Sequence, residues 1–334
     1  MKIEKILKEN DIEYKSNSPL SAYTTMGVGG PALYLAEIKD SEKLEHILTD
    51  AFKNQIPCLV LGKGSNVIIS DEGFKGLVLI NKTDNLEIID EEANCIQKHT
   101  TESRLETLNI KNENHKIKNF ALIRTASGVS VSSLAQKLYK KGISGLEWFA
   151  GIPASVGGAV YMNMHGGHYY FADLVQRAKL FSENGSRIVK NSYFKFDYDY
   201  SILHTTKEIV LWVELCLPKG NIESAKRTAK EWAGRKSNQP QRSAGCVFRN
   251  LTNKEKEKSG LPSVSIGYLL DNVLGLKGYQ IGGAKISEKH AAFIENTGSA
   301  TAKDVYQLVN FIKKTVNEKI KIDLKTEIEF IGTF

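Results

Sequence analysis

Residues 151–163 have the sequence Gly-Ile-Pro-Ala-Ser-Val-Gly-Gly-Ala-Val-Tyr-Met-Asn, which says more about this chain than any other segment. A proline, a serine and three glycines (Gly151, Gly157 and Gly158) stand in a run that is otherwise apolar and mostly small. Glycines let backbone N–H groups approach a ligand closely, as a phosphate or pyrophosphate requires. The same stretch is also compatible with a tight turn that opens a buried helix, so its meaning depends on the rest of the chain.

A second glycine-rich loop, Leu61-Gly62-Lys63-Gly64-Ser65-Asn66, lies upstream and follows an apolar run typical of a buried strand. Two such loops at strand ends suggest one large diphosphate cofactor that is held from two sides. Neither loop fits the common nucleotide templates, because the spacing of Gly62–Ser65 is not that of a Walker loop. Val67 replaces the third glycine of the dinucleotide fingerprint, so we do not expect a standard Rossmann dehydrogenase.

Composition is that of a soluble globular protein. The chain has 334 residues, of which 41% are hydrophobic and 25% charged, and this length predicts about two or three subdomains. The net charge of +7 comes from dispersed Lys and Arg residues without a recognised nucleic-acid motif, so we expect no nucleic-acid partner. A basic surface also suits a substrate that carries phosphates and a carboxylate.

No targeting, membrane or metal signal stands out. Met1–Ile12 has helical spacing and no long apolar stretch, which favours a surface helix over a signal peptide. No run approaches the about 18 apolar residues of a membrane span. The four cysteines are scattered without the spacing of metal ligands, and no helix carries a His-x-x-x-His pair. We therefore expect a cytoplasmic protein without a metal site.

Strand-like apolar runs alternate with helical patterns, which indicates a mixed architecture of the α/β or α+β class. A polar insertion over about residues 98–118 interrupts them, and the character of the chain changes after Pro218. We interpret residues 1–83 and 84–218 as two lobes of a cofactor domain and residues 219–334 as a substrate domain. The pattern predicts strands at 32–38, 57–61, 77–80, 174–182 and 208–217, a short strand from Cys246, a closing strand at Glu327–Ile331, and helices at 41–54, 130–141, 222–235 and about 301–320.

Two residues are candidates for catalysis. Cys246 follows small residues that would let another molecule approach, so its thiol could donate a proton, act as a nucleophile, or merely pack. Glu327 shares one face of an alternating strand with Glu329, which is also the pattern of a solvated polar face. Local sequence leaves these alternatives open.

Taken together, these segments resemble the MurB family of UDP-N-acetylenolpyruvoylglucosamine reductases, flavoenzymes of bacterial cell-wall synthesis. The resemblance is collinear over nearly the whole chain. It implies an α+β fold with a two-lobed FAD-binding domain of the vanillyl-alcohol-oxidase (PCMH) type and a C-terminal α+β substrate domain. The short path from Pro218 to Cys246 resembles the family branch that lacks a tyrosine-bearing loop. The matching stretches are Thr24–Ala32, Leu61–Asn66, Gly145–Asn163, Ser243–Asn250, Gly275–Gly278, Gly282–Ala284, His290–Asn296 and Leu324–Gly332.

The resemblance implies that NADPH reduces FAD, which then passes hydride to the enolpyruvyl ether of UDP-N-acetylglucosamine to give UDP-N-acetylmuramate for peptidoglycan. By position, Cys246 matches the family's proton donor. A thiol with a reference pKa of about 8.5 is mostly protonated at neutral pH and can supply that proton. Glu327 matches the catalytic glutamate, whose hydrogen bond to a substrate carboxylate as a neutral acid would require a raised pKa.

The resemblance also assigns binding residues, and it leads us to expect a monomer. Those expected to bind FAD are Thr25, Gly62, Lys63, Gly64, Ser65, Asn66, Val67, Gly151, Pro153, Ser155, Gly157, Gly158 and Asn163. Those expected to bind the UDP-sugar substrate are Arg242, Arg249, Asn250 and Lys277.

The clearest departure from the family pattern is Asp199, which stands where the resemblance leads us to expect an arginine that contacts the flavin edge and the substrate. A carboxylate cannot replace the five donors of a guanidinium. Either Arg242 or Arg249 reaches the site, or catalysis is impaired. The rival hypotheses are therefore a relative that binds FAD or a UDP-sugar without turnover, and a related flavin oxidase. Smaller departures are Ala154 in place of a glycine and Met164-His165-Gly166 in place of Ala-Gly-Ala.

Overall fold

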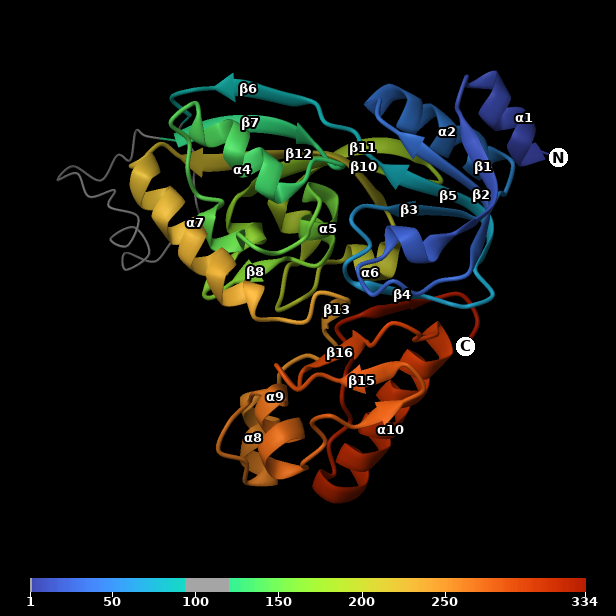
Figure 1. Ribbon diagram of the computed structural model, residues 1–334. Helices are drawn as coiled ribbons and strands as arrows, with labels where there is room; N and C mark the ends of the chain where they lie inside the picture. Colours follow the sequence, from blue (N-terminus) through green and yellow to red (C-terminus); the bar gives the residue numbers. More distant parts are fainter. Residues whose placement is uncertain (1, 94–119) are drawn as a thin grey trace. The chain divides into compact units, whose positions relative to one another are not determined.

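The computed structural model describes residues 2–93 and 120–334, and the predicted insertion at about 98–118 lies outside these ranges. Backbone contacts divide the chain into two compact units, both drawn in Figure 1. The predicted division into 1–83, 84–218 and 219–334 remains a prediction, since compact units need not coincide with functional domains. Unit 1 comprises residues 1–14, 36–62 and 79–237, and unit 2 comprises residues 15–35, 63–78 and 238–334.

A five-stranded antiparallel sheet with the order β11-β10-β12-β7-β6 forms the centre of unit 1 (Figure 1). Helix α5 packs on β7 and β12, and buried side chains of α4 and α5 share one apolar core with the sheet. The strands are β6 (Leu86–Asp90), β7 (Phe120–Ala126), β10 (Val175–Ser182), β11 (Gly185–Lys190) and β12 (Ile209–Pro218), and the helices are α4 (Val131–Tyr139), α5 (Val156–Tyr161), α6 (Leu203–Thr206) and α7 (Ile222–Ser237).

Helix α4 shows why the sequence folds as it does locally. Its apolar residues recur at helical spacing, and the predicted face of Val131, Leu134, Ala135 and Leu138 is buried. The remaining elements of unit 1 include a two-stranded ribbon of β8 and β9. These elements are α1 (Lys2–Glu9), α2 (Ser41–Lys53), β3 (Cys58–Leu61), η2 (Glu147–Phe149), β8 (His165–Gly166), β9 (Tyr169–Tyr170), η3 (Phe171–Asp173) and η4 (Asn191–Phe194).

A four-stranded sheet has the order β1-β2-β5-β3, with a short 3₁₀ helix, η1 (Leu20–Tyr23), between β1 and β2. Strands β2 and β5 are largely buried, which explains their continuous apolar sequence. The bounds not yet given are β1 (Tyr14–Pro19), β2 (Pro31–Ile38) and β5 (Phe74–Asn81).

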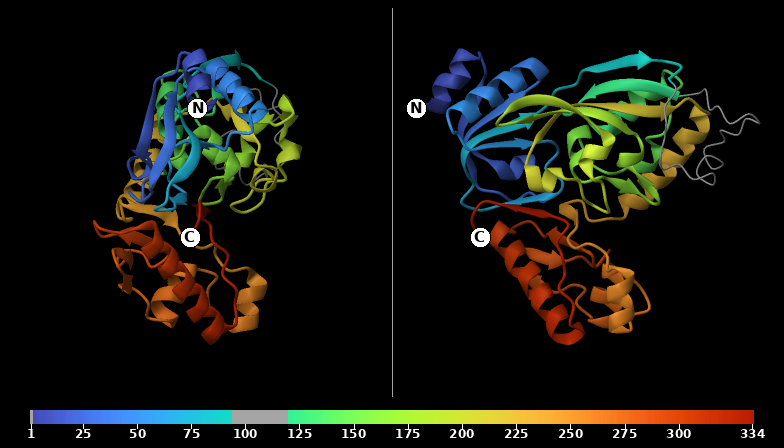
Figure 2. Two further views of the ribbon diagram at one scale, coloured as in Figure 1. Left: turned by 90° about the vertical axis from the view of Figure 1, so that its right-hand side faces the viewer. Right: turned by 180° about the vertical axis from the view of Figure 1, so that it is seen from behind.

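Unit 2 contains an antiparallel sheet, β13-β16-β15-β14, and a parallel pair, β17 and β4. The long helix α10 lies alongside β14 and β15 (Figure 2). Its first turn is capped by Thr301 and by Asp71, whose carboxylate accepts the N–H groups of Ala302 and Lys303 at 2.8 and 2.9 Å. The elements are β4 (Val67–Ile69), β13 (Ser243–Cys246), α8 (Asn253–Ser259), α9 (Ile266–Tyr268), a π-helical turn (Leu269–Val273), β14 (Gln280–Ile281), β15 (Ala284–Ile286), β16 (Phe293–Asn296), α10 (Ala302–Ile320) and β17 (Glu329–Ile331).

The predicted α+β class is confirmed, as are the five strands and the four helices predicted from their apolar patterns, within a few residues at their ends. Two boundaries were wrong. The strand expected to start at Cys246 ends there, and its pairing with β16 shifts register between Ser243 and Cys246, where Gly245 has φ +83°. The closing strand starts at Glu329 instead of Glu327. No helix in the described ranges is long and apolar enough to cross a membrane.

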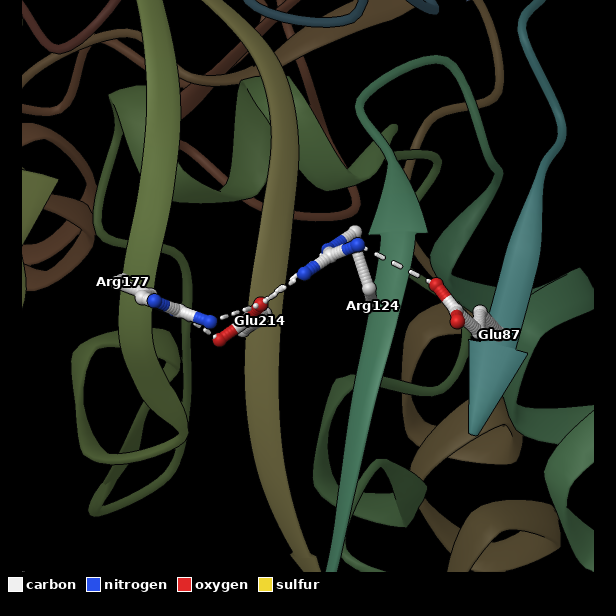
Figure 3. Close-up of polar contacts among 4 residues, drawn as sticks. All are labelled: Glu87, Arg124, Arg177 and Glu214. Atoms are coloured by element: carbon white, nitrogen blue, oxygen red, sulfur yellow. Dashed lines mark hydrogen bonds and ion pairs between the residues drawn. The ribbon is translucent and has the colours of Figure 1, made fainter. Parts of the chain in front are cut away.

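Four charged residues form one row across the sheet of unit 1 (Figure 3). The register places Arg177 opposite Glu214, Glu214 opposite Arg124, and Arg124 opposite Glu87. The Glu214 side chain is only 1% exposed, and it accepts hydrogen bonds from Arg124 Nη2 at 2.8 Å and Arg177 Nη2 at 3.0 Å. Burial by itself would raise the pKa of Glu214, but the bonds from Arg177 and Arg124 outweigh it and lower the pKa. The row joins four neighbouring strands.

Replacing Glu214 by glutamine should lower the free energy of unfolding by about 1–3 kcal/mol at neutral pH, because both arginines lose a charged partner while remaining partly solvated. Because the pKa of Glu214 is lowered by folding, its stabilisation is present above the ordinary carboxyl pKa of about 4.3 and is lost on further acidification. The difference between the variant and the parent should therefore shrink below that pH. Urea unfolding at neutral and acidic pH measures both effects.

Glu87→Gln is the matched control, since Glu87 is 63% exposed and, among the described residues, its carboxylate pairs with Arg124 at 3.3 Å. Its loss should stay below about 0.5 kcal/mol. Equal losses for the two variants would show that burial of Glu214 does not set the strength of the row.

Candidate active site

In unit 1, the stretch 151–163 forms a tight turn that leads into helix α5. Ser155 is the N-cap of this helix, and its buried hydroxyl accepts the N–H of Gly158 at 3.3 Å. The N–H of Gly157 donates to Ser127 O at 2.8 Å, and a Cβ on Gly157 would lie 3.0 Å from Ser127 Cβ. Close packing therefore explains Gly157, while Gly158 presents exposed backbone.

Gly62 comes from the other glycine-rich loop and lies against the same turn. A Cβ on Gly62 would stand 2.2 Å from Ser155 Oγ, a separation that no side chain could keep. Two loops that are far apart in the sequence thus meet in unit 1. Gly62 and Gly158, which have no side chain, lie beside the hydroxyl of Ser155. This combination fits the phosphates of a dinucleotide, which bind to backbone N–H groups and hydroxyls.

Gly151 and Asn163, two other predicted cofactor residues in unit 1, have identifiable structural roles. Gly151 has φ +82°, and a Cβ there would approach Lys236 Cβ to 2.9 Å. Pro153 is exposed. Asn163 is buried, and its amide is engaged at both ends, since Nδ2 donates to Asp197 O at 2.8 Å and Oδ1 accepts from Ala172 N at 3.0 Å. Asn163 therefore holds the chain after α5.

The remaining cofactor candidates, Thr25 and Lys63–Val67, belong to unit 2. Gly64 has φ +60°, and a Cβ there would lie 2.0 Å from Tyr23 O, so only glycine fits. Thr25 is held beside it, since its N–H donates to Gly64 O at 3.1 Å and its hydroxyl to Ser243 O at 2.6 Å. Lys63 is exposed, and Ser65 is half-buried.

Asn66 links this loop to the end of the chain. Its side-chain Nδ2 donates to Glu327 O at 3.1 Å, and its backbone O accepts the N–H of Glu329 at 2.9 Å. The parallel pairing of β17 with β4 starts at the next residue, with Glu329 opposite Val67. The predicted cofactor loop and the predicted catalytic glutamate are thus neighbours in unit 2.

The segment that carries Cys246 pairs with the segment that carries Glu327. The N–H of Glu327 donates to Val247 O at 2.9 Å, and Phe248 forms an antiparallel bridge with Thr326. Val247 and Phe248 are buried in the core of unit 2, whereas Cys246 and Glu327 are half-buried. Packing therefore anchors the paired segments and leaves both candidate catalytic side chains accessible to solvent.

The four predicted substrate residues also belong to unit 2. Arg242 is exposed, and a Cβ on Gly27 would lie 3.2 Å from its Nη2. Asn250 uses its Oδ1 to accept the N–H of Ile266 at 3.1 Å. Two further cations complete the set: Arg249 is half-buried, and its N–H bonds to Lys325 O at 3.0 Å, whereas Lys277 is exposed and pairs with Asp271 at 2.8 Å.

Asp199 is buried and has φ +47° in a turn where Asp197 and Tyr200 exchange backbone hydrogen bonds. Its Oδ1 lies 3.4 Å from His165 Nε2. Sequence reasoning missed this pair. The signal that could have found it is that both residues stand where the chain departs from the family pattern. Within the described ranges, no group of three or more His, Cys, Asp or Glu could hold a metal ion.

Models of known protein families match parts of both units. A family model described as the C-terminal domain of UDP-N-acetylenolpyruvoylglucosamine reductase matches residues 237–331, and one described as an FAD binding domain matches residues 104–190. The chain is 36% identical to UDP-N-acetylenolpyruvoylglucosamine reductase of Bacillus subtilis (strain 168), over 99% of this chain and 98% of that protein. It is 33% identical to the enzyme of the same name from Caldanaerobacter subterraneus, over 99% of this chain and 97% of that protein. The crystal structure of UDP-N-acetylenolpyruvylglucosamine reductase (MurB) from Thermus caldophilus aligns with a TM-score of 0.68 at 31% identity, covering 96% of this chain and 99% of that chain.

Replacing Gly62 by alanine tests the meeting of the two loops. The methyl group should displace the Ser155 hydroxyl from its cap, so we expect a stability loss of about 1–3 kcal/mol and FAD binding weakened about tenfold. Adding Ser155→Ala to this variant removes the colliding oxygen and should restore most of the stability. Thermal unfolding and the fluorescence of released FAD measure the two effects.

Gly234→Ala in helix α7 is the control, because nothing lies within 4 Å of a Cβ there. It should leave FAD retention unchanged and raise helix stability slightly. If Gly62→Ala behaves in the same way as Gly234→Ala, the close approach of Gly62 to Ser155 does not exist in solution.

Proposed function

The chain belongs to the family of UDP-N-acetylenolpyruvoylglucosamine reductases, and we propose that Cys246 and Glu327 are its catalytic residues. It is an FAD-dependent oxidoreductase with a flavin domain of the vanillyl-alcohol-oxidase type. It uses NADPH to reduce UDP-N-acetyl-3-O-(1-carboxyvinyl)glucosamine to UDP-N-acetylmuramate in the synthesis of peptidoglycan precursors. The expectations of fold, cofactors and activity from the sequence are thereby confirmed.

The observation that carries the assignment of catalytic residues is the hydrogen bond from Glu327 N–H to Val247 O. It supports a common site for Glu327 and Cys246, because Val247 directly follows the cysteine. Backbone bonds of this kind hold two reacting groups at a fixed separation without using their side chains. Both side chains are half-buried, as groups that meet a substrate and then release a product must be.

When bound, FAD supplies to the alkene of the substrate the hydride that it takes from NADPH. The carbon next to the one that receives hydride must then gain a proton, which we assign to the Cys246 thiol. The arriving hydride adds negative charge to a group that already bears a carboxylate. We propose that Glu327, as a neutral acid, donates a hydrogen bond to that carboxylate and so stabilises the charge as it develops.

We propose the cations Arg242, Arg249 and Lys277, together with the amide of Asn250, as the residues that bind the substrate. Arg242 and Lys277 are exposed, and both suit the diphosphate or the carboxylate of a UDP-sugar. Asp271 already pairs with Lys277, so this lysine must change partner if it binds the substrate.

We propose that the glycine-rich turn at Ser155 in unit 1 contacts FAD. As a separate proposal, Lys63–Val67 and Thr25 of unit 2 are flavin-binding residues. The close contacts of Gly62 and Gly64 support these proposals, because each leaves room for backbone alone. Gly151, Pro153, Gly157, Gly158 and Asn163 complete the proposed set, with Asn163 acting through its buried hydrogen bonds.

We also propose that residues 1–83 and 84–218 bind the flavin, that residues 219–334 bind the substrate, and that the enzyme is a cytoplasmic monomer. The substrate and NADPH are small soluble molecules, which is compatible with a single chain acting in the cytoplasm. Light scattering after size-exclusion chromatography tests the monomer, and cell fractionation tests the compartment.

Cys246→Ala should separate the two halves of the reaction. Anaerobic stopped-flow absorbance should show flavin reduction by NADPH at the parental rate, followed by reoxidation by the enolpyruvyl substrate slowed about 10²–10⁴-fold, because only the proton donor is lost. Cys246→Ser should recover much of the second rate, since a hydroxyl can also supply a proton.

Cys58→Ala is the matched control for a thiol outside the proposed site. Burial raises the pKa of the Cys58 thiol to about 12, which disfavours the nucleophilic thiolate at neutral pH. Both half-reactions should remain parental in this variant. Parental turnover of Cys246→Ala would remove Cys246 from the mechanism, and a colourless parent that cannot be loaded with FAD would contradict the flavin assignment.

A further inference from the structure

The chain that follows helix α5 is tied to the turn at residues 197–201 by side-chain hydrogen bonds. Asn163 Nδ2 donates to Asp197 O at 2.8 Å, and Ser201 Oγ donates to Tyr161 O at 2.6 Å. Ser201 is fully buried. These two bonds join neutral groups, so they fix the relative position of the two segments whatever the pH.

A third link lies between the same segments and is of another kind. His165 Nε2 lies 3.4 Å from Asp199 Oδ1, and the Asp199 side chain is only 4% exposed. The imidazole packs beside two tyrosines, with ring centroids 5.1 Å from Tyr198 and 5.7 Å from Tyr170. A buried carboxylate at this distance favours a proton on Nε2 and thereby selects one tautomer of the ring.

The other ring nitrogen shows that stability alone does not explain the pair. His165 Nδ1 is buried and has no hydrogen-bond partner among the described residues. A buried polar atom left in this way costs about 1–3 kcal/mol, and such exceptions in folded proteins call for a reason. The backbone of Asp199 adopts φ +47°, a left-handed conformation that aspartate tolerates better than most residues other than glycine.

We infer that His165 and Asp199 form a carboxylate–histidine pair that holds the end of the glycine-rich segment in the position needed to bind flavin, so that both are positioning residues. The inference rests on the proposed flavin site at Ser155 and extends it. The segment from Ser155 to His165 is continuous, with α5 between them, and a shift at His165 therefore reaches the flavin loop through one short helix. Neither residue is assigned a step in the reaction.

Asp199→Asn is the sharpest variant, because asparagine keeps the volume of aspartate and tolerates positive φ. It removes the charge and no longer selects which ring nitrogen of His165 carries the proton. His165→Ala removes the partner. Each variant should raise the dissociation constant of FAD about three- to tenfold, measured as flavin fluorescence released on dilution of the purified holoenzyme. The double variant should resemble either single one, since the two residues act as a pair.

Glu208→Gln controls for a merely structural effect in the same unit. Glu208 is also a buried carboxylate, 5% exposed in its side chain, and it pairs with Arg187 at 2.8 Å. This variant should lose stability without releasing flavin. Equal flavin release from Glu208→Gln and Asp199→Asn, FAD dissociation constants within about twofold of the parent, or multiplying effects in the double variant would each overturn the positioning role.

The parent protein separates failure of this inference from failure of the proposed site. If the parent retains FAD and NADPH bleaches it, while Gly62→Ala releases it, the flavin site stands and the variants at 165 and 199 test the pair alone. If Gly62→Ala retains FAD as the parent does, the proposed flavin loop is wrong, and the pair then has no flavin to position.

Discussion

Unit 2 depends on the last strand of the chain, because three distant stretches of sequence meet there through main-chain hydrogen bonds. Glu327 bonds to Val247, Glu329 bonds to Asn66, and β17 continues as the parallel partner of β4. Main-chain bonds make no demand on the side chains that they bring together, so catalytic residue types can occupy the site without loss of pairing. What the pairing does demand is close approach, and at Gly332, which directly follows β17, a Cβ would lie 2.8 Å from Ser70 Cβ.

Two buried carboxylates of unit 1, those of Glu214 and Asp199, have different kinds of partner. Glu214 lies between two guanidinium groups that stay charged at any physiological pH, in a row fixed by strand register. Asp199 instead faces an imidazole whose second nitrogen is buried and has no hydrogen-bond partner among the described residues. The first arrangement is what a sheet needs to remain intact. The second arrangement joins two loops while leaving His165 Nδ1 buried without a hydrogen bond among the described residues. That loss of free energy is understandable if the loops must present a ligand site.

Long periodic elements could be predicted because their signal is local. Helices α4 and α10 repeat apolar residues on one face over several turns, and burial of that face follows directly from the spacing. Strands β14, β15 and β16 have two to four residues each, too few for an alternating pattern to stand out from chance. They form because neighbouring segments supply their hydrogen-bond partners, which no local pattern records.

The candidate site likewise has features that the sequence indicated and features that only the fold reveals. The collinear motifs, through their resemblance to a family, indicated a flavoenzyme and made Cys246 and Glu327 catalytic candidates, a role that the local sequence left open. The resemblance also marked Asp199 as a departure, and compensation by Arg242 or Arg249 stays a prediction. That His165 faces Asp199 follows from a turn packing against the chain after α5.

The amino-acid sequence alone therefore indicated the class of cofactor through its resemblance to a family, and it predicted the longer helices and strands through their local spacing. Only the tertiary structure decided that Gly62 lies against Ser155, that Glu327 bonds to Val247, and that Arg177, Glu214 and Arg124 share a row. The reason is physical. Contacts between residues far apart in the chain depend on strand register and on the packing of whole elements, which the free energy of the entire fold selects and no single segment encodes.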